Sequence, residues 1–341
     1  MSKKCNVAIV GATGLIGRTM LTILKQRRFP INELYLLASE RSQGEPIQFN
    51  KKTLLVENVA DFDFKKADIA LFTAGASVSA HYVPIATKNA CIVIDNTSQF
   101  RYDDEVPLII PEVNPEALAH YNKRNIIANP NCSTIQMLLV LKPIYDAAGI
   151  SRINVVTFQS VSGAGRQALQ ELIDQSGRLL SGRAIKKPKA FVGQIAFNII
   201  PHIDEFQKNG YTREEMKMVW ETQKIFADKS IQVNSTAVRV PVLYGHSESI
   251  HIETKEKISA FQAKQCLKKA PGVSVIDRQV NNGYPMPVMQ NFREDDVMVG
   301  RLREDISHPL GLNLWIVADN TRKGAALNAV QIAEHLVQDH L

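Results

Sequence analysis

A glycine-rich turn near the N-terminus constrains the fold of this chain more than any other stretch of its sequence. Glycines recur at every third position from Gly11 through Gly14 to Gly17, directly after a predicted strand, 4–10, and at the start of a helical stretch, 15–27. Between a strand and a helix, glycines at this spacing permit a tight turn, close approach of the backbone to a pyrophosphate, and close helix–strand packing. The turn therefore predicts a βα unit that binds a dinucleotide at a helix N-terminus, and a plain turn is the alternative.

The residues after the second predicted strand, 34–38, bear on which dinucleotide binds. At this position an acidic side chain favours the ribose hydroxyl of NAD, whereas an arginine favours the 2′-phosphate of NADP. The chain has Ser39, Glu40, Arg41 and Ser42 here. Glu40 complicates the choice, but Arg41 and Ser42 together offer a guanidinium and a hydroxyl to a phosphate. We therefore expect NADP, with a solvated loop as the alternative.

Further predicted strands continue the same domain and end in small or polar residues. They lie at 68–72, 91–95 and 126–128. Ala74 and Gly75, for example, come shortly after the first of them. Such positions are the carboxyl ends of parallel strands, where open α/β sheets bind their ligands. Residues 1–128 are therefore expected to form a Rossmann-type dinucleotide-binding domain with a parallel sheet.

The rest of the chain has a different pattern, with longer strands among the helices. Strands are predicted at 153–160, 235–242, 249–253, 297–302 and 312–318, and helices at 167–180, 213–226 and 259–268. This pattern indicates an α+β domain with a mixed sheet over 129–318, and such a sheet often provides a dimer face. A last amphipathic helix is predicted at 321–336. We expect the C-terminal segment 319–341 to pack back on the first domain.

Composition and cysteine content indicate the class and the compartment of the protein. A chain of 341 residues that is 45% hydrophobic and 22% charged is long enough for roughly two domains with ordinary cores. Its four cysteines are too few and too widely spaced for a disulfide framework, and none forms a Cys-x-x-Cys metal knuckle. The apolar run before Gly11 is too short for a signal peptide or a membrane span. We therefore expect a soluble, unprocessed, cytoplasmic protein without a metal.

The positive charge of the chain does not indicate nucleic-acid binding. The formal net charge is +6, but lysine and arginine are spread along the chain without a basic stripe interleaved with aromatic residues. One dense basic patch, 183–189, is interpreted as a solvated loop rather than a polyanion site. A mild positive excess also suits anionic small molecules.

A polar turn in the middle of the chain carries a candidate nucleophile. Residues 129–131 precede Cys132, and an apolar helical stretch, 135–141, follows. If the helix begins at these polar residues, Cys132 lies in its first turn, where unpaired N–H groups and a partial positive charge stabilise a thiolate. Cys132 is therefore a candidate nucleophile. The alternative is a small buried hydrophobic residue, as free cysteines usually are.

A thiol beside a nicotinamide has few chemical uses. The most economical is acyl transfer, in which the thiolate attacks an activated acyl group and hydride reduces the resulting thioester to an aldehyde, or the reverse. Such a site also needs a general acid or base and hydrogen-bond donors for the developing oxyanion. The sequence offers residues of both kinds.

Several short blocks of sequence occur together in a specific order and spacing. They are the glycine turn from Gly11, residues 96–101, 129–134, 159–165, 221–224 and 239–246, and Asp319 with Asn320. In these blocks the chain resembles the aspartate-β-semialdehyde dehydrogenase family along nearly its whole length. The resemblance implies a Rossmann-type domain plus a catalytic and dimerisation domain of the semialdehyde dehydrogenase and glyceraldehyde-3-phosphate dehydrogenase-like type.

The same resemblance implies a reaction. Members of the family interconvert L-aspartate 4-semialdehyde and L-4-aspartyl phosphate in a reversible, phosphate-dependent reaction, which runs in biosynthesis as an NADPH-driven reduction. The implied pathway supplies lysine, through diaminopimelate, and also threonine and methionine. A homodimer is expected.

Roles for individual residues follow from the resemblance. Cys132 is the implied acyl-thioester nucleophile, His246 the acid/base catalyst, and Gln159 orients the acyl group. The substrate presents a phosphoryl group, an α-carboxylate and an α-ammonium, so the pocket needs two anion sites and one carboxylate. The implied substrate-binding residues are Arg101, Lys224 and Asn131 for the phosphate, Arg239 for the carboxylate and Glu221 for the ammonium. Lys217 competes with Lys224 for the phosphate, and Glu221 with Lys224 also matches a surface ion pair.

The expected cofactor-binding residues come from the glycine turn, the strand ends and the resemblance. They are Gly11, Ala12, Thr13, Gly14, Leu15, Ile16, Gly17, Ser39, Arg41, Ser42, Ala74, Gly75, Ser162, Gly163 and Asn320. The last three are expected to line the nicotinamide. Two alternatives remain for the whole chain. One is another acyl-phosphate reductase, such as N-acetyl-γ-glutamyl-phosphate reductase, whose substrate has no free amine. The other is a non-catalytic nucleotide-binding relative, which we expect to lack the thiol.

Overall fold

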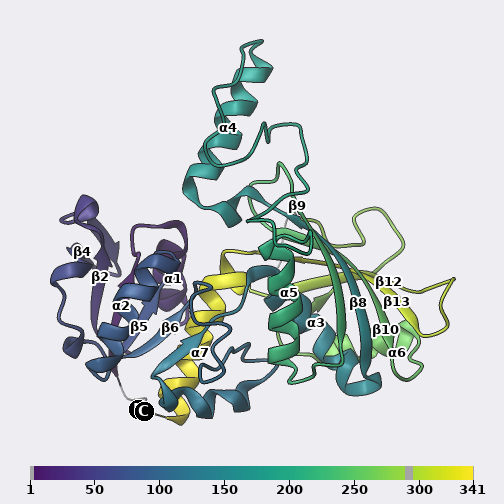
Figure 1. The fold of residues 1–341 in the computed structure, drawn as a ribbon, viewed down its shortest axis with the longest axis horizontal. Coiled ribbons are helices and arrows are strands. Elements are labelled where there is room, and N and C mark those ends of the chain that lie inside the picture. The colour runs from purple at the N-terminus through teal and green to yellow at the C-terminus, as the bar shows by residue number, and fades with distance from the viewer. Residues whose placement is uncertain (1–3, 289–294, 341) are drawn as a thin grey trace. The chain divides into compact units, whose positions relative to one another are not determined.

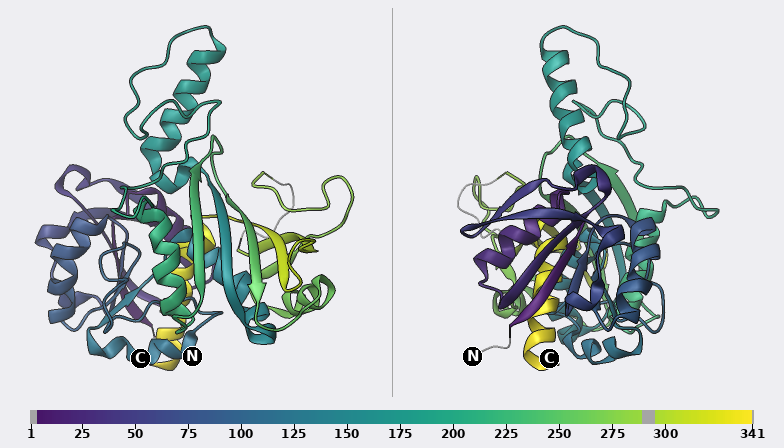
Figure 2. Two further views of the ribbon diagram at one scale, coloured as in Figure 1. Left: turned by 45° about the vertical axis from the view of Figure 1, so that its right-hand side comes forward. Right: turned by 90° about the vertical axis from the view of Figure 1, so that its left-hand side faces the viewer.

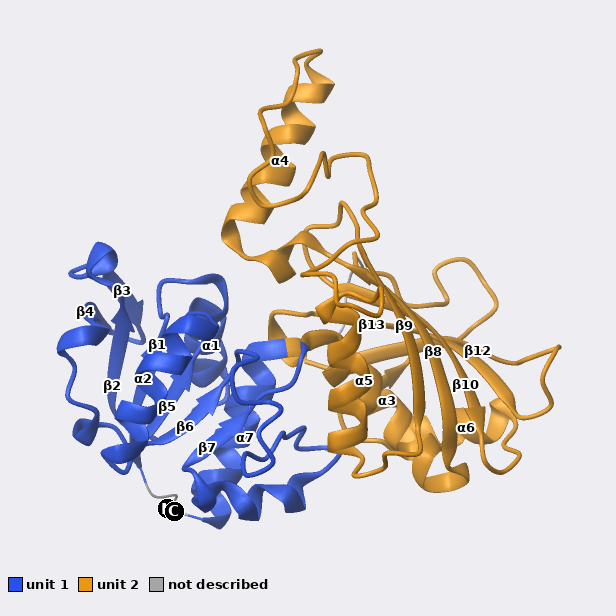
Figure 3. Cartoon of the chain, viewed as in Figure 1, with its two compact units in different colours: residues 1–131, 325–341 blue, residues 132–324 orange. Residues whose placement is uncertain are grey.

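The chain forms two compact units. A computed structural model describes residues 4–288 and 295–340 (Figure 1). Unit 1 contains Met1–Asn131 and Ala325–Leu341, and unit 2 contains Cys132–Gly324 (Figure 3). None of the helices in the described part of the chain combines the length and the apolar character needed to cross a bilayer.

Unit 1 is built on a seven-stranded sheet. Its strands, in sheet order, are β3 (Pro46–Phe49), β4 (Lys52–Asn58), β2 (Ile31–Ala38), β1 (Cys5–Val10), β5 (Ile69–Phe72), β6 (Ile92–Asp95) and β7 (Ile126–Ala128). Every neighbouring pair is parallel except the β3–β4 hairpin. β1 lies between β2 and β5, so the order of the strands reverses at β1. Ligands of open parallel sheets bind at such a reversal, at the carboxyl ends of the strands.

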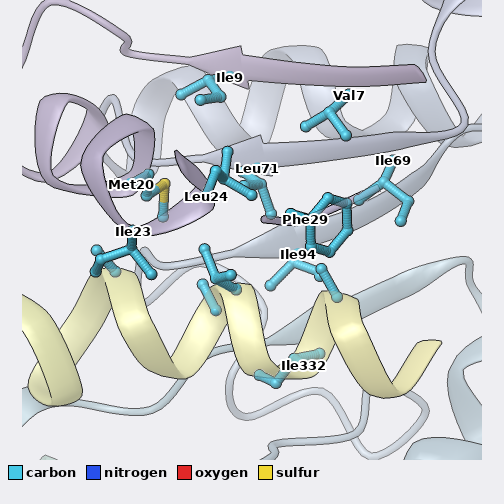
Figure 4. Packing of buried hydrophobic residues seen from close by; sticks show 14 of the residues in the cluster. Val7, Ile9, Met20, Ile23, Leu24, Phe29, Ile69, Leu71, Ile94 and Ile332 are labelled. Atoms are coloured by element: carbon cyan, nitrogen blue, oxygen red, sulfur yellow. The ribbon is translucent and has the colours of Figure 1, made fainter. Parts of the chain in front are cut away.

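The core of unit 1 joins the two ends of the chain. The helices of this unit are α1 (Leu15–Gln26), α2 (Ala76–Lys88) and α7 (Leu327–Asp339). Met20 and Ile23 of α1 and Ile332 of α7 are buried in one cluster with Ile9 and Leu71 of the sheet (Figure 4). The C-terminal helix therefore completes the hydrophobic core of the N-terminal sheet.

Unit 2 is built on a six-stranded mixed sheet. Its strands, in sheet order, are β11 (Val273–Val275), β12 (Val297–Glu304), β13 (Gly311–Ala318), β10 (His246–Thr254), β8 (Ile150–Gln159) and β9 (Gln232–Arg239). The pairs β11–β12 and β8–β9 are parallel and the others are antiparallel. Helices α3 (Cys132–Ala148), α5 (Arg213–Ile225) and α6 (Ala260–Lys269) pack along this sheet, whereas α4 (Arg166–Leu180) stands away from it (Figure 2).

The predicted fold class is confirmed, and the sequence patterns found nearly all of the long elements. A Rossmann-type parallel sheet and an α+β unit with a mixed sheet are both present. The β3–β4 hairpin, β11 and the helix α2 were not predicted. The three strands lie at or next to the sheet edges, and their side chains alternate only weakly between buried and exposed. Such edge strands lack the hydrophobic periodicity on which sequence patterns depend.

Candidate active site

The glycine turn of unit 1 has the geometry that its sequence predicts. Gly11 has a φ of +94°, and a Cβ added to it would lie 3.0 Å from the backbone nitrogen of Ala74. A Cβ on Gly17 would lie 2.3 Å from the carbonyl oxygen of Gly11 and 2.8 Å from the Cα of Ala12. A side chain does not fit at Gly17, since real Cβ atoms do not approach so closely, and at Gly11 the positive φ and the tight contact both favour glycine. α1 begins directly after this turn, so its first N–H groups are available to a phosphate.

The other expected cofactor residues of unit 1 lie at the ends of neighbouring strands. Ser39 follows β2, and Glu40 and Arg41 begin a short 3-10 turn with exposed side chains. Gly75 has a φ of +104° and open space where a Cβ would be. These residues fit a dinucleotide whose phosphates meet the α1 N-terminus. Within 4–288 and 295–340, no group of three His, Cys, Asp or Glu side chains is placed to hold a metal ion.

Arg101 also belongs to unit 1 and is held by backbone carbonyl groups. Its Nε donates to the carbonyl oxygen of Asn129 at 2.9 Å, and its Nη2 donates to that of Asn96 at 2.8 Å. Arg101 is 6% exposed, and Asn131 is 7% exposed. The guanidinium of Arg101 is therefore fixed at the carboxyl ends of β6 and β7, where the polar turn before Cys132 begins.

Cys132 is the first residue of α3, as the sequence predicts, and its side chain is half-buried. The N–H groups of the first helical turn and the helix dipole favour a negative charge at this position. Gly324 lies in a π-helical turn, η6 (Arg322–Ala326), and a Cβ on it would lie 3.0 Å from the Cβ of Cys132. A larger side chain at this position would crowd Cys132. The sequence patterns did not indicate Gly324, because the contact joins segments that are distant in the chain.

His246 begins β10, and its imidazole is completely buried. The backbone N–H of Ser160 donates to its Nδ1 at 3.1 Å, and the Ser160 hydroxyl lies 3.0 Å from the same nitrogen. Among the described residues, Nε2 has no hydrogen-bond partner. Burial, and after it the neighbouring charge of Arg239, lower the pKa of His246 to about 3, while the charge of Glu214 opposes the shift. The ring is therefore neutral near pH 7.

Arg239 ends β9 and is also buried, with 6% of its surface exposed. Its Nη1 donates to the carbonyl oxygen of Ser160 at 2.7 Å. Burial lowers its pKa, while the negative charges of Glu214 and of the Cys132 thiolate raise it. A Cβ on Gly163 would lie 2.9 Å from Nη1 of Arg239 and 3.1 Å from Nε2 of His246. Gly163 therefore leaves room for two buried nitrogen donors to approach one place.

Gln159 ends β8 and is oriented by a carboxylate that the sequence patterns missed. Its Nε2 donates to Glu214 Oε1 at 3.0 Å and to the Ser133 hydroxyl at 3.1 Å. The other oxygen of Glu214 accepts from Lys217 Nζ at 2.9 Å, and Lys217 also donates to Asp204 at 2.7 Å. Glu214 is 5% exposed. Since a carboxylate only accepts hydrogen bonds, it fixes which end of the Gln159 amide faces it.

Glu221 and Lys224 lie farther along the same helix. Glu221 is seven residues, or about 10 Å of helix rise, beyond Glu214, and its side chain is completely buried. Two turns separate the pairs, so both present the same face of α5. Glu214 and Lys217 lie at the end of α5 that reaches Gln159, and Glu214 is the carboxylate whose charge acts on Arg239 and His246. The structure thus adds Glu214 to the candidate site and pairs it with Lys217, which the sequence offered as the alternative to Lys224.

Asn320 links the loops around the imidazole. Its Oδ1 accepts from the Ser160 hydroxyl at 3.0 Å, the Ser162 hydroxyl at 3.1 Å and the backbone N–H of Gly245 at 3.1 Å. Unit 2 therefore brings together seven of the residues that sequence and resemblance indicated. These are Cys132, Gln159, Ser162, Gly163, Arg239, His246 and Asn320.

Comparison with known proteins gives this site its family. Residues 6–121 match the semialdehyde dehydrogenase NAD-binding domain, and residues 141–323 match the semialdehyde dehydrogenase dimerisation domain. The aspartate-semialdehyde dehydrogenase of Legionella pneumophila is 58% identical over 341 residues, which covers 100% of this chain and 98% of the relative. This chain belongs to the aspartate-semialdehyde dehydrogenase family. The resemblance read from its sequence blocks is confirmed.

Other aspartate-semialdehyde dehydrogenases agree over the whole chain. Aspartate-semialdehyde dehydrogenase 2 of Vibrio cholerae is 58% identical over 340 residues, covering 100% of both chains. The crystal structure of Vibrio cholerae aspartate semialdehyde dehydrogenase II complexed with ASA superposes with a TM-score of 0.97, at 57% identity and 100% coverage of both chains. The Candida albicans enzyme with NADP, at 24% identity, has a TM-score of 0.77 and covers 98% of each chain, which supports the fold. Membership makes the chain an oxidoreductase of amino-acid biosynthesis.

Proposed function

We propose that this protein catalyses the reversible reduction of L-4-aspartyl phosphate to L-aspartate 4-semialdehyde through a thioester on Cys132. In the first step the thiolate attacks the acyl carbon, and inorganic phosphate leaves with the electrons of the broken C–O bond. NADPH supplies the hydride that reduces the thioester. The carbonyl then re-forms, and the semialdehyde leaves as the electrons of the C–S bond return to the sulfur.

One observation carries this proposal. The half-buried thiol at the N-terminus of α3 shares unit 2 with a buried neutral imidazole, His246, and a buried guanidinium, Arg239. Both basic side chains present nitrogen donors in the space that Gly163 leaves open. A nucleophile next to fixed donors is the arrangement that acyl transfer requires, because negative charge develops on the acyl oxygen.

The charged groups of the site fit an amino-acid substrate. We assign the α-carboxylate to Arg239, whose planar guanidinium suits a bidentate carboxylate. Glu214 is the better candidate for the α-ammonium than Glu221, because it contacts Gln159 and lies in the electrostatic field of Arg239. By the same contact, Lys217 is the better candidate for the phosphate than Lys224. Arg101 and Asn131 are assigned to the same phosphate.

The cofactor that we propose is NADP. The phosphates lie against the glycine turn from Gly11 to Gly17, where the backbone of Gly11 and Gly17 is tightly packed and α1 begins. The exposed guanidinium of Arg41 is available to a 2′-phosphate after β2. Asn320 uses its Oδ1 within the protein, so its Nδ2 is the end that can donate to a nicotinamide carboxamide.

The biological setting of the proposal follows from the reaction. We assign the enzyme to the cytoplasm and to the branch that supplies lysine through diaminopimelate, threonine and methionine. A homodimer is proposed, supported by the match of residues 141–323 to a dimerisation domain. Val156 of β8 is 37% exposed and lies in the unit 2 sheet, so part of this sheet is open to a second subunit.

A spectrophotometric assay tests the reaction directly. Purified enzyme is given L-aspartate 4-semialdehyde and NADP, with and without inorganic phosphate, and NADPH formation is followed. We expect turnover that depends on phosphate and is abolished by Cys132→Ala, while Cys266→Ala, a half-buried cysteine elsewhere in unit 2, retains it. Undiminished turnover of Cys132→Ala contradicts the thioester mechanism. A preference for an N-acylated substrate favours the related acyl-phosphate reductases instead.

A pair of matched variants tests the assignment of the ammonium. Glu214→Gln and Glu221→Gln remove one charge each from the same face of α5. We expect Glu214→Gln to raise KM for the semialdehyde or lower kcat by about 10- to 100-fold, since a hydrogen bond to a charged group contributes about 1.5–3 kcal/mol. Glu221→Gln is expected to change these constants much less. The reverse order returns the role to Glu221.

A further inference from the structure

Glu248 is a buried carboxyl group to which the proposed reaction gives no role. It lies in β10, two residues after His246, and none of its surface is exposed. Because side chains alternate along a strand, Glu248 faces the same way as Ile250 and Ile252, which are also buried. An apolar side chain would suit this position, since a buried carboxyl group costs free energy unless its hydrogen bonds offset that cost. Packing alone therefore does not account for Glu248.

The partners of Glu248 lie in the first turns of α3. Gln136 Nε2 donates to Glu248 Oε1 at 2.6 Å, and the hydroxyl of Ser133 is also hydrogen-bonded to this carboxyl group. Ser133 and Gln136 are three residues apart, so they share one face of the helix, and both are completely buried. Ser133 directly follows Cys132, the first residue of α3. The carboxyl group thus holds the helical turn that begins with the thiol.

The Ser133 hydroxyl connects Glu248 to Gln159. Gln159 Nε2 donates to Ser133 Oγ at 3.1 Å and to Glu214 Oε1 at 3.0 Å. A hydroxyl group has a single proton to donate and can accept at the same time. Since Ser133 accepts from Gln159, its own proton is the one that bonds to Glu248. A continuous series of hydrogen bonds therefore runs from Glu248 through Ser133 to Gln159 and Glu214.

Glu248 takes part in this series as a neutral acid. Burial raises its pKa well above 4.5, and the hydrogen bonds from Gln136 and Ser133 oppose this shift without cancelling it. Among the described residues Glu248 Oε2 has no hydrogen-bond partner, so a proton can reside there while Oε1 accepts. A neutral carboxyl group still offers its carbonyl oxygen, and it adds no second negative charge to a site that already contains Glu214. What Glu248 supplies is therefore an acceptor at a fixed place.

We propose that Glu248 is a positioning residue for the thioester reaction: by accepting the proton of the Ser133 hydroxyl, it fixes the amide of Gln159 that orients the acyl group. The inference rests on the proposed function and adds to it a residue that does not touch the substrate. Without this acceptor the Ser133 hydroxyl can rotate, and its oxygen no longer faces Gln159 in one orientation. Gln159 then loses one of the two close hydrogen bonds that hold its amide. A misplacement of about 1 Å at a reacting centre can cost about 100-fold in rate.

Substitutions of Glu248 separate an acceptor from a charge. Glu248→Gln keeps a carbonyl oxygen in the place of Oε1, so we expect it to retain most of the wild-type kcat for phosphate-dependent oxidation of the semialdehyde. The pair Gln136→Met with Glu248→Met replaces both partners by apolar side chains, which avoids an unpaired buried amide, and it leaves Ser133 without this acceptor. We expect this methionine pair to lower kcat by about 10- to 100-fold. Wild-type kcat in the methionine pair, or an equal loss in Glu248→Gln, overturns the proposal.

A control variant separates the hydrogen bonds from the packing of the core. Ile250→Val removes a methyl group from the same face of β10 and breaks no side-chain hydrogen bond. We expect it to unfold at a lower urea concentration than wild type but to retain kcat. NADP binding, measured by calorimetry, is expected to be unchanged in every variant, because the glycine turn belongs to unit 1. If Ile250→Val loses as much activity as the methionine pair, core packing sets the rate and the proposal fails.

A double-mutant cycle tests whether Glu248 acts through Ser133. Ser133→Ala removes the hydroxyl group with little change in volume, and alanine favours a helix, so this variant carries the test even if the methionine pair does not fold. We expect Ser133→Ala to lower kcat about as much as the methionine pair, and the combination of the two to lower it no further. Multiplied losses in the combination, or full activity of Ser133→Ala, overturn the role of Glu248.

A failure of this inference is distinguishable from a failure of the proposed function. If Cys132→Ala retains turnover, the thioester reaction itself is wrong. If turnover depends on Cys132 and on phosphate while Ser133→Ala and the methionine pair keep the wild-type kcat, the reaction stands and only the positioning role of Glu248 is refuted.

Discussion

Acidification provides a quantitative test of the buried, neutral state of His246. In the folded protein the pKa of this imidazole is lowered from 6.5 to about 3 by burial and by Arg239. In the unfolded chain the ring regains an ordinary pKa. Between the two values the unfolded state binds more protons than the folded state, so the free energy of unfolding increases with pH through this window. The free energy of unfolding is therefore at its full value above about pH 6.5, and protonation of the unfolded ring lowers it as the pH falls toward 3.

The size of the effect follows from the two pKa values. One unit of pKa difference corresponds to about 1.4 kcal/mol, and at about pH 5 the unfolded ring is almost fully protonated while the folded ring is not. The linkage then destabilises the folded state by about 2 kcal/mol relative to about pH 8. His246→Gln has no titrating group at this position. We therefore expect wild type to lose about 2 kcal/mol more than His246→Gln between these two pH values.

Urea unfolding followed by tryptophan fluorescence measures this difference. Both tryptophans, Trp220 and Trp315, belong to unit 2, which also contains His246, so the signal reports the relevant unit. Protein concentration is held constant, because a dimer gains stability with concentration. His120→Gln removes an exposed imidazole of unit 1 and serves as the control, which we expect to follow wild type. If His246→Gln has the same pH dependence as wild type, His246 is not held neutral and the argument from burial fails.

Three further predictions address other parts of the structure. Glu248 is completely buried, and burial raises its pKa well above 4.5 despite a hydrogen bond from Gln136 at 2.6 Å, so keeping this carboxyl in the folded protein costs more as the pH rises above 4.5. Glu248→Gln should therefore be at least as stable as wild type in urea unfolding at about pH 8, and a marked loss of stability would show that the carboxyl is ionised. Gly17→Ala should displace the turn at Gly11, because the new Cβ would lie 2.3 Å from the Gly11 carbonyl oxygen. We expect a destabilisation of about 1–3 kcal/mol in urea unfolding and loss of NADP binding in calorimetry, and wild-type affinity for NADP would show that this turn does not bind the cofactor. Arg41→Ala should weaken NADP binding by about tenfold or more and leave NAD binding unchanged, and a preference for NAD that is present in wild type and survives the substitution would contradict the NADP assignment.

The parts of the structure that the sequence predicts are those in which a local backbone requirement determines the residue. Glycine is required at Gly17 because a Cβ does not fit and is favoured at Gly11 by its positive φ, and these requirements are visible as a spacing of glycines. The start of α3 at Cys132 is visible as a polar turn before an apolar helical stretch. Strands such as β8 and β10 follow from alternating side chains, although their ends differ from the predicted ones by a few residues.

The parts that local patterns do not predict depend on contacts across the sheet of unit 2. Ser160 and His246 are 86 residues apart in sequence and meet because β8 and β10 are neighbours. Gly324 meets Cys132 only because a π-helical turn approaches the start of α3. Local periodicity reports which face of an element is buried, but not which residue of another element lies opposite. A single sequence therefore identifies the candidate nucleophile more readily than the residues that support it.

Helix α5 shows that a motif recognised correctly can still match two positions in the sequence. The helix contains Glu-x-x-Lys twice, as Glu214 with Lys217 and as Glu221 with Lys224. The two pairs are seven residues apart, so both lie on the face of the helix that packs toward the sheet. Hydrophobic periodicity and spacing are the same for both pairs. They differ because α5 runs antiparallel to β9, so the start of the helix, with Glu214 and Lys217, lies beside the end of the strand. Arg239 is at that end of β9, and the charge of Glu214 reaches it. A buried guanidinium requires a nearby counter-charge, so electrostatics in the folded protein selects Glu214 where the sequence alone allows either residue.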